Sequence, residues 1–238
     1  MDTFPVCIKP VTLLALDTST TACSVALSIG SDVRTRYVVA PREHAQRLLL
    51  MVDSLLSEAG LELSDLDAVA FGKGPGSFTG IRIAAGVAQG LAFGKSLPVI
   101  PISSLAALAY GQYDTEPCYV VSVLDARMQQ IYWGAYHCSE KGVRDLSTEC
   151  VADPESLCGN LPDEISEWVA VGNGEEVYQD LLFERCSSKV TIKSGFLPHA
   201  RDVVRLAYYE YLMDNSVLAE EALPVYLRDK VVHHIKGG

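Results

Sequence analysis

Apolar positions in the first part of the chain are spaced as in β-strands. Apolar residues dominate Val11–Leu16, Cys23–Ile29 and Val33–Val39. The short segment Gly30-Ser31-Asp32 separates the last two runs, which favours a tight hairpin turn. The pattern therefore predicts that three antiparallel strands open the chain.

The spacing of apolar residues then changes to that of helices. Apolar positions recur every three to four residues from Pro41 to Ala59, and Gly60, a common helix terminator, follows them. The predicted elements of this part are a helix at Pro41–Ala59, a strand at Ala68–Phe71, a helix at Ile81–Phe93, a strand at Pro98–Ile102 and a helix from Ser103 to Ala109.

The second half repeats the opening pattern after a polar segment at 111–117. The predicted strands are 118–124, 130–137, about 146–151, 168–171 and 190–192, and the predicted helices are about 175–183 and 200–213. Both halves begin with a hairpin that follows or contains an aspartate turn. We therefore expect an α/β protein in which a mixed sheet with helices is built twice, with lobes at 1–110 and 111–238.

Two helices of the first half carry more apolar surface than one buried face needs. Arg82 and Gln89 are the only polar side chains of the segment Ile81–Phe93, and Leu49, Leu50 and Met51 widen the apolar stripe of the helix before it. A surface helix normally shows a wide polar face. The pattern favours an interface with another protein over a helix buried between layers.

Composition indicates a globular protein of a reducing compartment. Hydrophobic residues make up 49% and charged residues 21% of the 238 positions. The seven cysteines are odd in number, and none lies in a C-x-x-C spacing, so a disulfide framework is not expected. The chain shows neither a secretory leader nor an apolar run of 18 residues, which predicts a cytoplasmic protein without membrane contact.

The net charge of −11 is concentrated in the second half. Residues 1–110 carry 8 basic and 9 acidic side chains, and residues 111–238 carry 11 and 21. Proteins that bind nucleic acid tightly neutralise phosphates with Lys and Arg. Any role on nucleic acid is therefore expected to be exercised through a partner.

One segment could bind a phosphate group. Four glycines between a strand and a helix, together with an aspartate-containing turn after the first strand, could direct backbone N–H groups and hydroxyls at an anion. The loop matches neither the Walker A pattern nor the dinucleotide fingerprint, so a purely structural turn remains the alternative. The candidate cofactor-binding residues are Asp17, Thr18, Ser19, Gly74, Gly76, Ser77 and Thr79.

The sequence shows no arrangement typical of a catalytic centre. The five histidines have neither H-x-x-x-H nor H-E-x-x-H spacing, and G-x-S-x-G is absent. We therefore predict no metal site and no catalytic residue in this chain. A second aspartate turn, Asp125-Ala126-Arg127, occupies the matching place in the second half and keeps a nucleotide cleft open as an alternative.

Several segments resemble those of the TsaB (YeaZ) family, in the same order along the chain. The segments are Leu14–Leu27, Pro41–Arg47, Gly72–Arg82, Leu124–Met128 and Pro224–Arg228. The stretch Gly-Pro-Gly-Ser-Phe-Thr-Gly-Ile-Arg is the most specific of them. The chain departs from the family at Gln129-Gln130, where Gly-Glu is usual.

The resemblance implies an actin-like ATPase (ASKHA, ribonuclease H-like) fold in two lobes. It also implies a non-catalytic dimerisation and scaffold subunit of the complex that transfers threonylcarbamoyl to the adenosine beside the anticodon of tRNAs reading codons that begin with A. The implied partners are the catalytic subunit TsaD, the ATPase TsaE and a second copy of the chain, with tRNA contacted only through the complex.

The resemblance places the partner interface on the two apolar-rich helices. The interface residues carried over by position are His44, Arg47, Leu48, Met51, Leu55, Arg82, Ala85, Gln89 and Phe93. No cofactor is implied for the chain alone, although ATP or ADP could bind in the complex. The alternative is a stand-alone ATPase or small-molecule kinase that uses the cleft between the two aspartate turns. A peptidase is a weaker reading, since no metal ligands are visible.

Overall fold

The computed structural model describes residues 10–157, 161–162, 164–173 and 189–228. The first of two sheets contains five strands in the order β3-β2-β1-β4-β5. Strands β1, β2 and β3 run antiparallel, whereas β4 and β5 run parallel to β1. The strands span Thr12–Asp17 (β1), Ala22–Ile29 (β2), Asp32–Val39 (β3), Ala68–Gly74 (β4) and Val99–Ser103 (β5).

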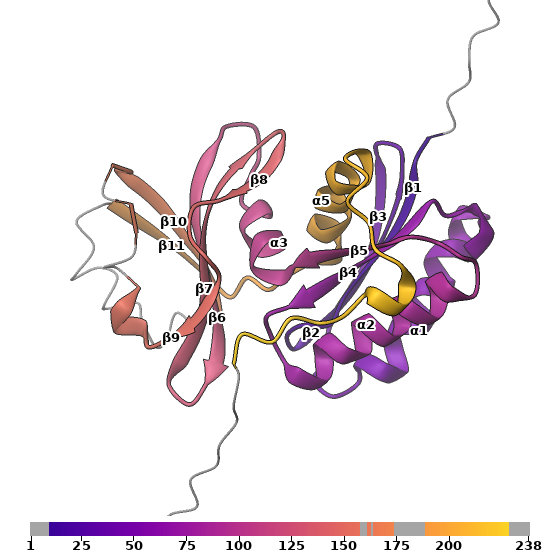
Figure 1. Ribbon diagram of the computed structural model, residues 1–238, viewed down its shortest axis with the longest axis horizontal. Coiled ribbons are helices and arrows are strands. Elements are labelled where there is room, and N and C mark those ends of the chain that lie inside the picture. Colours follow the sequence, from indigo (N-terminus) through magenta and orange to yellow (C-terminus); the bar gives the residue numbers. More distant parts are fainter. Residues whose placement is uncertain (1–9, 158–160, 163, 174–188, 229–238) are drawn as a thin grey trace, which may run out of the picture.

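The second sheet begins in the same way and forms the other lobe (Figure 1). Its main order is β11-β10-β6-β7-β8, with β9 paired to β7; β6 and β7 are antiparallel, and β10 lies parallel to β6. The strands are Cys118–Arg127 (β6), Gln130–Ser139 (β7), Gly142–Asp145 (β8), Cys150–Ala152 (β9), Glu167–Gly172 (β10) and Lys189–Ser194 (β11). Each sheet thus contains an antiparallel hairpin whose first strand also has a parallel neighbour, which is the duplicated mixed sheet that the sequence predicted.

One predicted strand is different in the structure. The predicted strand near 146–151 does not form: β8 ends at Asp145, residues 146–149 lie outside any strand, and the short β9 begins only at Cys150 and pairs with β7. The predicted helix at about 175–183 lies outside the described residues.

The helices cover both faces of the first sheet. They are α1 (His44–Ala59), α2 (Phe78–Phe93), α3 (Ser104–Tyr110) and α5 (Ala200–Leu212), with short 3₁₀ turns η1 (Leu63–Asp65), η2 (Pro154–Ser156) and η4 (Ala219–Glu221). Helix α2 begins three residues earlier than predicted, because Ser77 caps it by accepting a hydrogen bond from the backbone of Gly80. Within the described residues, no helix combines the length and apolarity needed to cross a membrane.

Strand β1 is buried on both sides, since its side chains alternate between two hydrophobic cores. Leu14 and Leu16 pack in the core that α1 and α2 cover, whereas Leu13 and Ala15 pack in the core that contains α5. Helices α1 and α2 lie side by side, and α5 packs against the first sheet. The sides of α1 and α2 that point away from the first sheet lie at the surface of this lobe, where the end of the chain crosses α2 (Figure 1).

The end of the chain returns to the first lobe. Val217 pairs with Val99 through two backbone hydrogen bonds of 2.8 and 2.9 Å. Residues 217–228, the C-terminal strap, then pass over α2 toward the β6–β7 turn (Figure 1). The division at 110/111 separates the two sheets in sequence, but α5 and the C-terminal strap lie with the N-terminal sheet in space.

Candidate partner-binding face and the Asp17 turn

Helix α1 has one face committed to the core of its own lobe. Its buried residues are His44, Leu48, Val52, Leu55 and Leu56. Leu48 and Leu55 have no exposed surface, because they pack on the sheet beneath α1. The sequence predicted that these two residues contact a partner, and their packing in the core of the lobe contradicts that prediction. His44 is also buried, and its Nε2 lacks a hydrogen-bond partner in the part of the chain that the structure describes.

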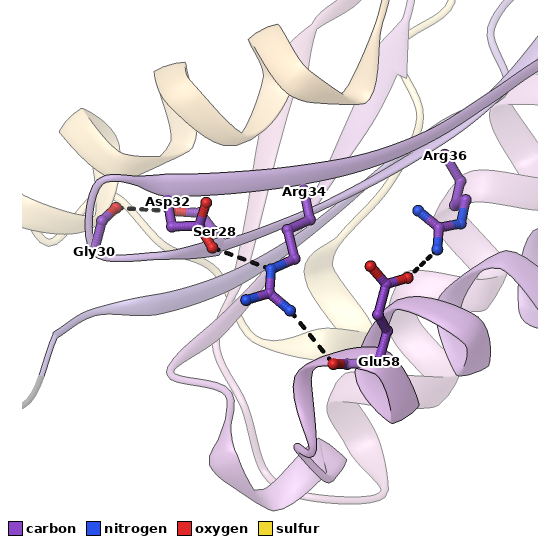
Figure 2. A network of polar contacts seen from close by, with 6 residues as sticks. All are labelled: Ser28, Gly30, Asp32, Arg34, Arg36 and Glu58. Carbon is purple, nitrogen blue, oxygen red and sulfur yellow. Dashed lines mark hydrogen bonds and ion pairs between the residues drawn. The ribbon is translucent and has the colours of Figure 1, made fainter.

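Polar contacts hold the C-terminal end of α1 against the edge strand β3 (Figure 2). Arg34 donates to the backbone oxygen of Glu58 at 3.4 Å, and Arg36 forms an ion pair with the Glu58 carboxylate. Arg34 is itself oriented by Asp32, with 3.0 Å between Nε and Oδ2. These contacts fix which side of α1 faces outward.

The outward side of α1 carries large apolar side chains. Leu50 is 69% exposed and Leu49 is 50% exposed. Met51 is half-buried, with its Sδ 3.8 Å from the sulfur of Cys23. Arg47 is exposed and pairs with Glu43 one turn earlier. Of the residues predicted on α1, Arg47 and Met51 therefore remain accessible to a partner.

Helix α2 is divided in the same way. Ile81, Ala84, Ala85, Ala88 and Ala92 face the sheet and are buried. Ala85, predicted as an interface residue, is 3% exposed and belongs to the core of this lobe. Its small side chain lets α2 approach strand β4 closely, so it is not available to a partner.

The outward side of α2 combines small residues with a large aromatic ring. Arg82, Gly86 and Gly90 recur every four residues and are exposed, and Phe93 is 77% exposed. A side-chain carbon added at Gly86 or Gly90 would meet no atom within 4 Å. The fold of this chain therefore does not require glycine at either position.

The C-terminal strap borders this face and orients two of its predicted residues. The Arg82 guanidinium lies 3.7 Å from the Phe78 ring centre and donates to the Tyr226 hydroxyl at 2.7 Å. Gln89 donates to the backbone oxygen of Ala222 at 3.2 Å. Both side chains are therefore held by contacts within the chain.

The seven candidate cofactor-binding residues are brought together, but they pack against one another. Ser77 N–H donates to the backbone oxygen of Ser19 at 2.6 Å, and the Thr18 hydroxyl donates to the oxygen of Gly80 at 2.7 Å. A side-chain carbon at Gly76 or Gly80 would lie 2.3 or 1.9 Å from a backbone oxygen of the Asp17 turn. The glycine loop therefore uses its donors and its close backbone approach internally, as a structural turn.

The exposure of these residues agrees with this interpretation. Asp17, Thr18 and Ser19 have no exposed surface, and Gly74 is buried. Ser77 and Thr79 are exposed, but the Ser77 hydroxyl already accepts the Gly80 N–H. The burial of Asp17, Thr18, Ser19 and Gly74 and the pairing of the Ser77 hydroxyl therefore favour a structural turn over a phosphate site.

Asp17 is nonetheless electrostatically unusual. Burial raises its pKa to about 6, although hydrogen bonds from the backbone and hydroxyl of Ser19 partly oppose this effect. The second aspartate turn makes separate contacts: Asp125 pairs with Arg127 at 3.1 Å, and its backbone N–H donates to Asn173. No contact described here joins the two aspartates in one site.

Side chains of the two lobes meet next to Asp17. Ser104 lies 3.5 Å from an Asp17 carboxylate oxygen, and the neighbouring Ser103 donates to Glu149 of the second lobe. Tyr136 donates to the same Glu149 oxygen at 2.7 Å. The chain's own side chains therefore occupy this contact between the lobes.

The described residues contain no cluster of three or more histidine, cysteine, aspartate or glutamate side chains that could hold a metal ion.

Sequence reasoning missed Gly86 and Gly90 as members of the outward face, although their four-residue spacing from Arg82 was visible. It also missed the C-terminal strap, because nothing in residues 217–228 indicates which helix they cross.

Comparisons with known proteins all match the chain to proteins of tRNA threonylcarbamoyladenosine modification. A protein-family model described as "TsaD: tRNA N6-adenosine threonylcarbamoyltransferase" matches residues 38–234. The chain is similar to "tRNA threonylcarbamoyladenosine biosynthesis protein TsaB" of Escherichia coli, with 41% identity over 223 residues, covering 92% of this chain and 95% of that protein. The protein of the same description in Haemophilus influenzae is 41% identical, covering 92% and 94%.

A solved structure extends the similarity to three dimensions. The structure described as "YeaZ from Pseudomonas aeruginosa" superposes with a TM-score of 0.81 and 45% identity, covering 91% of this chain and 100% of that chain. Sequence and structure are therefore similar over almost the whole length of both molecules.

Proposed function

Since this chain belongs to the TsaB (YeaZ) family of tRNA threonylcarbamoyladenosine biosynthesis proteins, we propose that it is a non-catalytic docking subunit of the complex that makes this modification. In this role it supports TsaD, the subunit that transfers threonylcarbamoyl to the adenosine beside the anticodon in tRNAs reading A-starting codons. It contributes a binding surface and no reacting group.

The observation that carries this proposal is the outward side of α1 and α2, which we call the α1–α2 face. It presents Leu49, Leu50 and Phe93 beside the exposed glycines 86 and 90. Glycine inside a helix costs roughly 0.5–1 kcal/mol relative to alanine. Because this fold has room for a side chain at both glycines, their presence favours a partner that approaches the backbone closely.

The nature of the family match supports TsaD as the partner on this face. A model named for TsaD matches 197 residues of this chain (38–234), so the two proteins are related in sequence. Two related lobes can pair through equivalent helices about a pseudo-two-fold axis. The same geometry would let two copies of this chain pair, so the homodimer and the complex with TsaD would compete for one face.

We propose that neither a nucleotide nor a metal ion is needed by this chain alone. The packed Asp17 turn and the contact between Ser103 and Glu149 support this proposal. ATP or ADP would then bind only where TsaD or TsaE supplies further groups. With a charge of −11, the chain would contact tRNA only through the complex, in the cytoplasm.

Size-exclusion chromatography with purified TsaD tests the docking proposal. The change Leu50→Glu places a charge on the α1–α2 face and is expected to weaken the complex at least about 30-fold, roughly 2 kcal/mol. The matched control is Leu212→Glu, because Leu212 is 60% exposed at the end of α5, away from this face. Equal binding by both variants, or no complex with the unchanged chain, would reject the proposal.

Calorimetry with ATP and Mg²⁺ separates this role from the alternative of a stand-alone ATPase or small-molecule kinase. The isolated chain is expected to show neither tight binding nor turnover. Micromolar ATP binding that depends on Asp17 would favour the alternative, a role that no contact among the described residues supports.

A further inference from the structure

Two cysteines lie directly opposite each other in the second lobe, away from the α1–α2 face. Cys118 begins β6 and is paired in register with Cys138 of β7, so both side chains point to the same side of the sheet. Directly opposed residues of antiparallel strands have Cα atoms about 4.5–5.5 Å apart, which lies within the range that a disulfide bridges. Both are free thiols in the structure.

The two thiols differ in access. Cys138 has no exposed surface, whereas Cys118 is half-buried and lines a cavity of about 430 Å³. Val169 of β10 and Thr191 of β11 also line this cavity. A small molecule in this cavity would meet Cys118 first.

The surroundings of the pair make Cys118 the more acidic thiol. A hydrogen bond from the Cys138 thiol lowers the pKa of Cys118 to about 7, against the opposing effect of partial burial, and the Lys193 ammonium lowers it further. The same hydrogen bond and burial raise the pKa of Cys138. A thiolate is the nucleophilic form of cysteine, so Cys118, the more accessible member of the pair, is also the more reactive one.

The other described cysteines show the contrast. Burial raises the pKa of Cys23 to about 11 and also raises that of Cys150. Cys150 lies in the same lobe and is half-buried like Cys118, but it is opposite Trp133. The properties of Cys118 therefore arise from its pairing with Cys138 and from Lys193.

We propose that Cys118 and Cys138 form a reversible dithiol–disulfide couple in which Cys118, facing the cavity, reacts first with a hydroperoxide and Cys138 completes the disulfide. Cavity residues Glu164 and Glu167 bring carboxylates, which disfavour anionic oxidants and favour a neutral hydroperoxide. Disulfides of cytosolic proteins are usually transient and redox-sensing, and this couple would belong to that class.

The reaction consists of two balanced steps. The Cys118 thiolate attacks the terminal oxygen of the hydroperoxide, so that an S–O bond forms, the O–O bond breaks, and the departing alkoxide takes a proton from water to become an alcohol. Cys118 is then a sulfenic acid. The Cys138 sulfur attacks the Cys118 sulfur, the S–S bond forms, and the hydroxyl group leaves with the Cys138 proton as water. The two thiols lose two electrons, which reduce the O–O bond.

Oxidation of Cys118 also prepares Cys138 for the second step. The thiolate of Cys118 opposes ionisation of Cys138 through its charge and by holding the thiol proton. The sulfenic acid is neutral, so this opposition ends once the first step is complete. The order of the two steps therefore follows from the arrangement of the pair.

The test uses the full chain, reduced with dithiothreitol, transferred to pH 7 and treated with tert-butyl hydroperoxide as the probe. Peptide mapping by mass spectrometry, which distinguishes all seven cysteines, is expected to find a Cys118–Cys138 link that dithiothreitol reverses. Cys138→Ser is expected to leave a sulfenic acid at Cys118 that dimedone traps, and Cys118→Ser to leave Cys138 unreacted. Cys150→Ser is the matched control and should behave as the unchanged chain.

A measurement on the unchanged chain keeps the test independent of whether the variants fold. Iodoacetamide at pH 7 is expected to alkylate Cys118 about tenfold faster than Cys150, because the larger thiolate fraction outweighs its lower intrinsic nucleophilicity. Equal alkylation rates, a disulfide that joins other cysteines or two molecules, or no disulfide at all would overturn the proposal.

Discussion

Gly80 and Gly86 lie on the same helix, α2, but only one of them is required by contacts within the chain. At Gly80 an added side-chain carbon would lie 1.9 Å from the backbone oxygen of Thr18, whereas at Gly86, on the same helix, it would meet no atom within 4 Å. The first glycine is required by contacts within the chain. The second is not, and it lies on the outward α1–α2 face.

This difference separates a structural motif from a binding surface. The glycine-rich loop resembles a phosphate-binding loop in composition, yet its closest approaches, at Gly72, Gly76 and Gly80, are to Asp17 and the turn that follows it. The outward glycines, Gly86 and Gly90, lie four residues apart, and contacts within the fold do not explain them. A glycine is therefore a better indicator of a binding surface where the chain itself leaves space beside it.

The largest expected effect is a loss of stability at Gly80, where the chain leaves no space for a side chain. Gly80→Ala forces a carbon against the Thr18 backbone oxygen, which cannot move without displacing β1, and should lower the free energy of unfolding by about 4 kcal/mol. Urea denaturation measures this change. A loss below about 1 kcal/mol would show that the loop is not tightly packed on the Asp17 turn.

The next effect concerns the buried carboxyl of the same turn. The pKa of Asp17 is about 6 in the folded chain and 3.8 as its ordinary value, so the folded state retains the proton between these two pH values. The stability that the neutral carboxyl contributes is complete below pH 4 and is lost as the pH rises through 6. Asp17→Asn should therefore raise the free energy of unfolding at pH 7.5 by up to about 3 kcal/mol.

The advantage of Asp17→Asn should disappear near pH 4, which denaturation at several pH values would detect. In the reconstituted tRNA modification reaction this variant should retain activity within about twofold, because the proposed role uses no catalytic carboxylate. Loss of activity with retained stability would instead indicate that Asp17 has a chemical role.

A smaller effect, on binding, is expected at Gly86, where the fold leaves space beside the backbone. Gly86→Leu should leave the folded chain intact, since there is space for the side chain, but should weaken the complex with TsaD about 10- to 30-fold by preventing close approach. Isothermal titration calorimetry measures the affinity. Unchanged binding would show that the partner does not contact α2 at this position.

The smallest effect provides the matched control for Gly80→Ala. Gly86→Ala adds the same single carbon to the same helix and should raise the free energy of unfolding by about 0.5–1 kcal/mol, because alanine restricts the unfolded chain. Thermal or urea denaturation measures it. Destabilisation would mean that Gly86 has a structural role that its open surroundings do not show.

Much of the fold could be predicted from local sequence. A continuous apolar run predicted β1, and two loosely alternating runs predicted β2 and β3. Ser103 predicted the start of α3, and Gly60 predicted the end of α1, where it adopts the left-handed conformation. Local signals also predicted that Arg82 and Gln89 share one side of α2. These features depend on neighbours within a few residues, which the sequence displays directly.

The roles of particular residues were less predictable. Leu48, Leu55 and Ala85 were expected at a partner interface, yet they pack on the sheet of their own lobe. Leu50 and Phe93 satisfy the same periodic pattern and face outward. Periodicity shows that a helix has apolar stripes, but it does not show which stripe meets the sheet.

The sequence by itself determined the elements, their doubled order and the family, because helix and strand periods, caps and turns are local and the family segments are contiguous. The tertiary structure decided that the glycine loop closes on the Asp17 turn, that the C-terminal strap orients Arg82, and that Cys118 faces Cys138. These three outcomes depend on residues between 20 and 144 positions apart, whose approach is decided by how the sheets and helices pack.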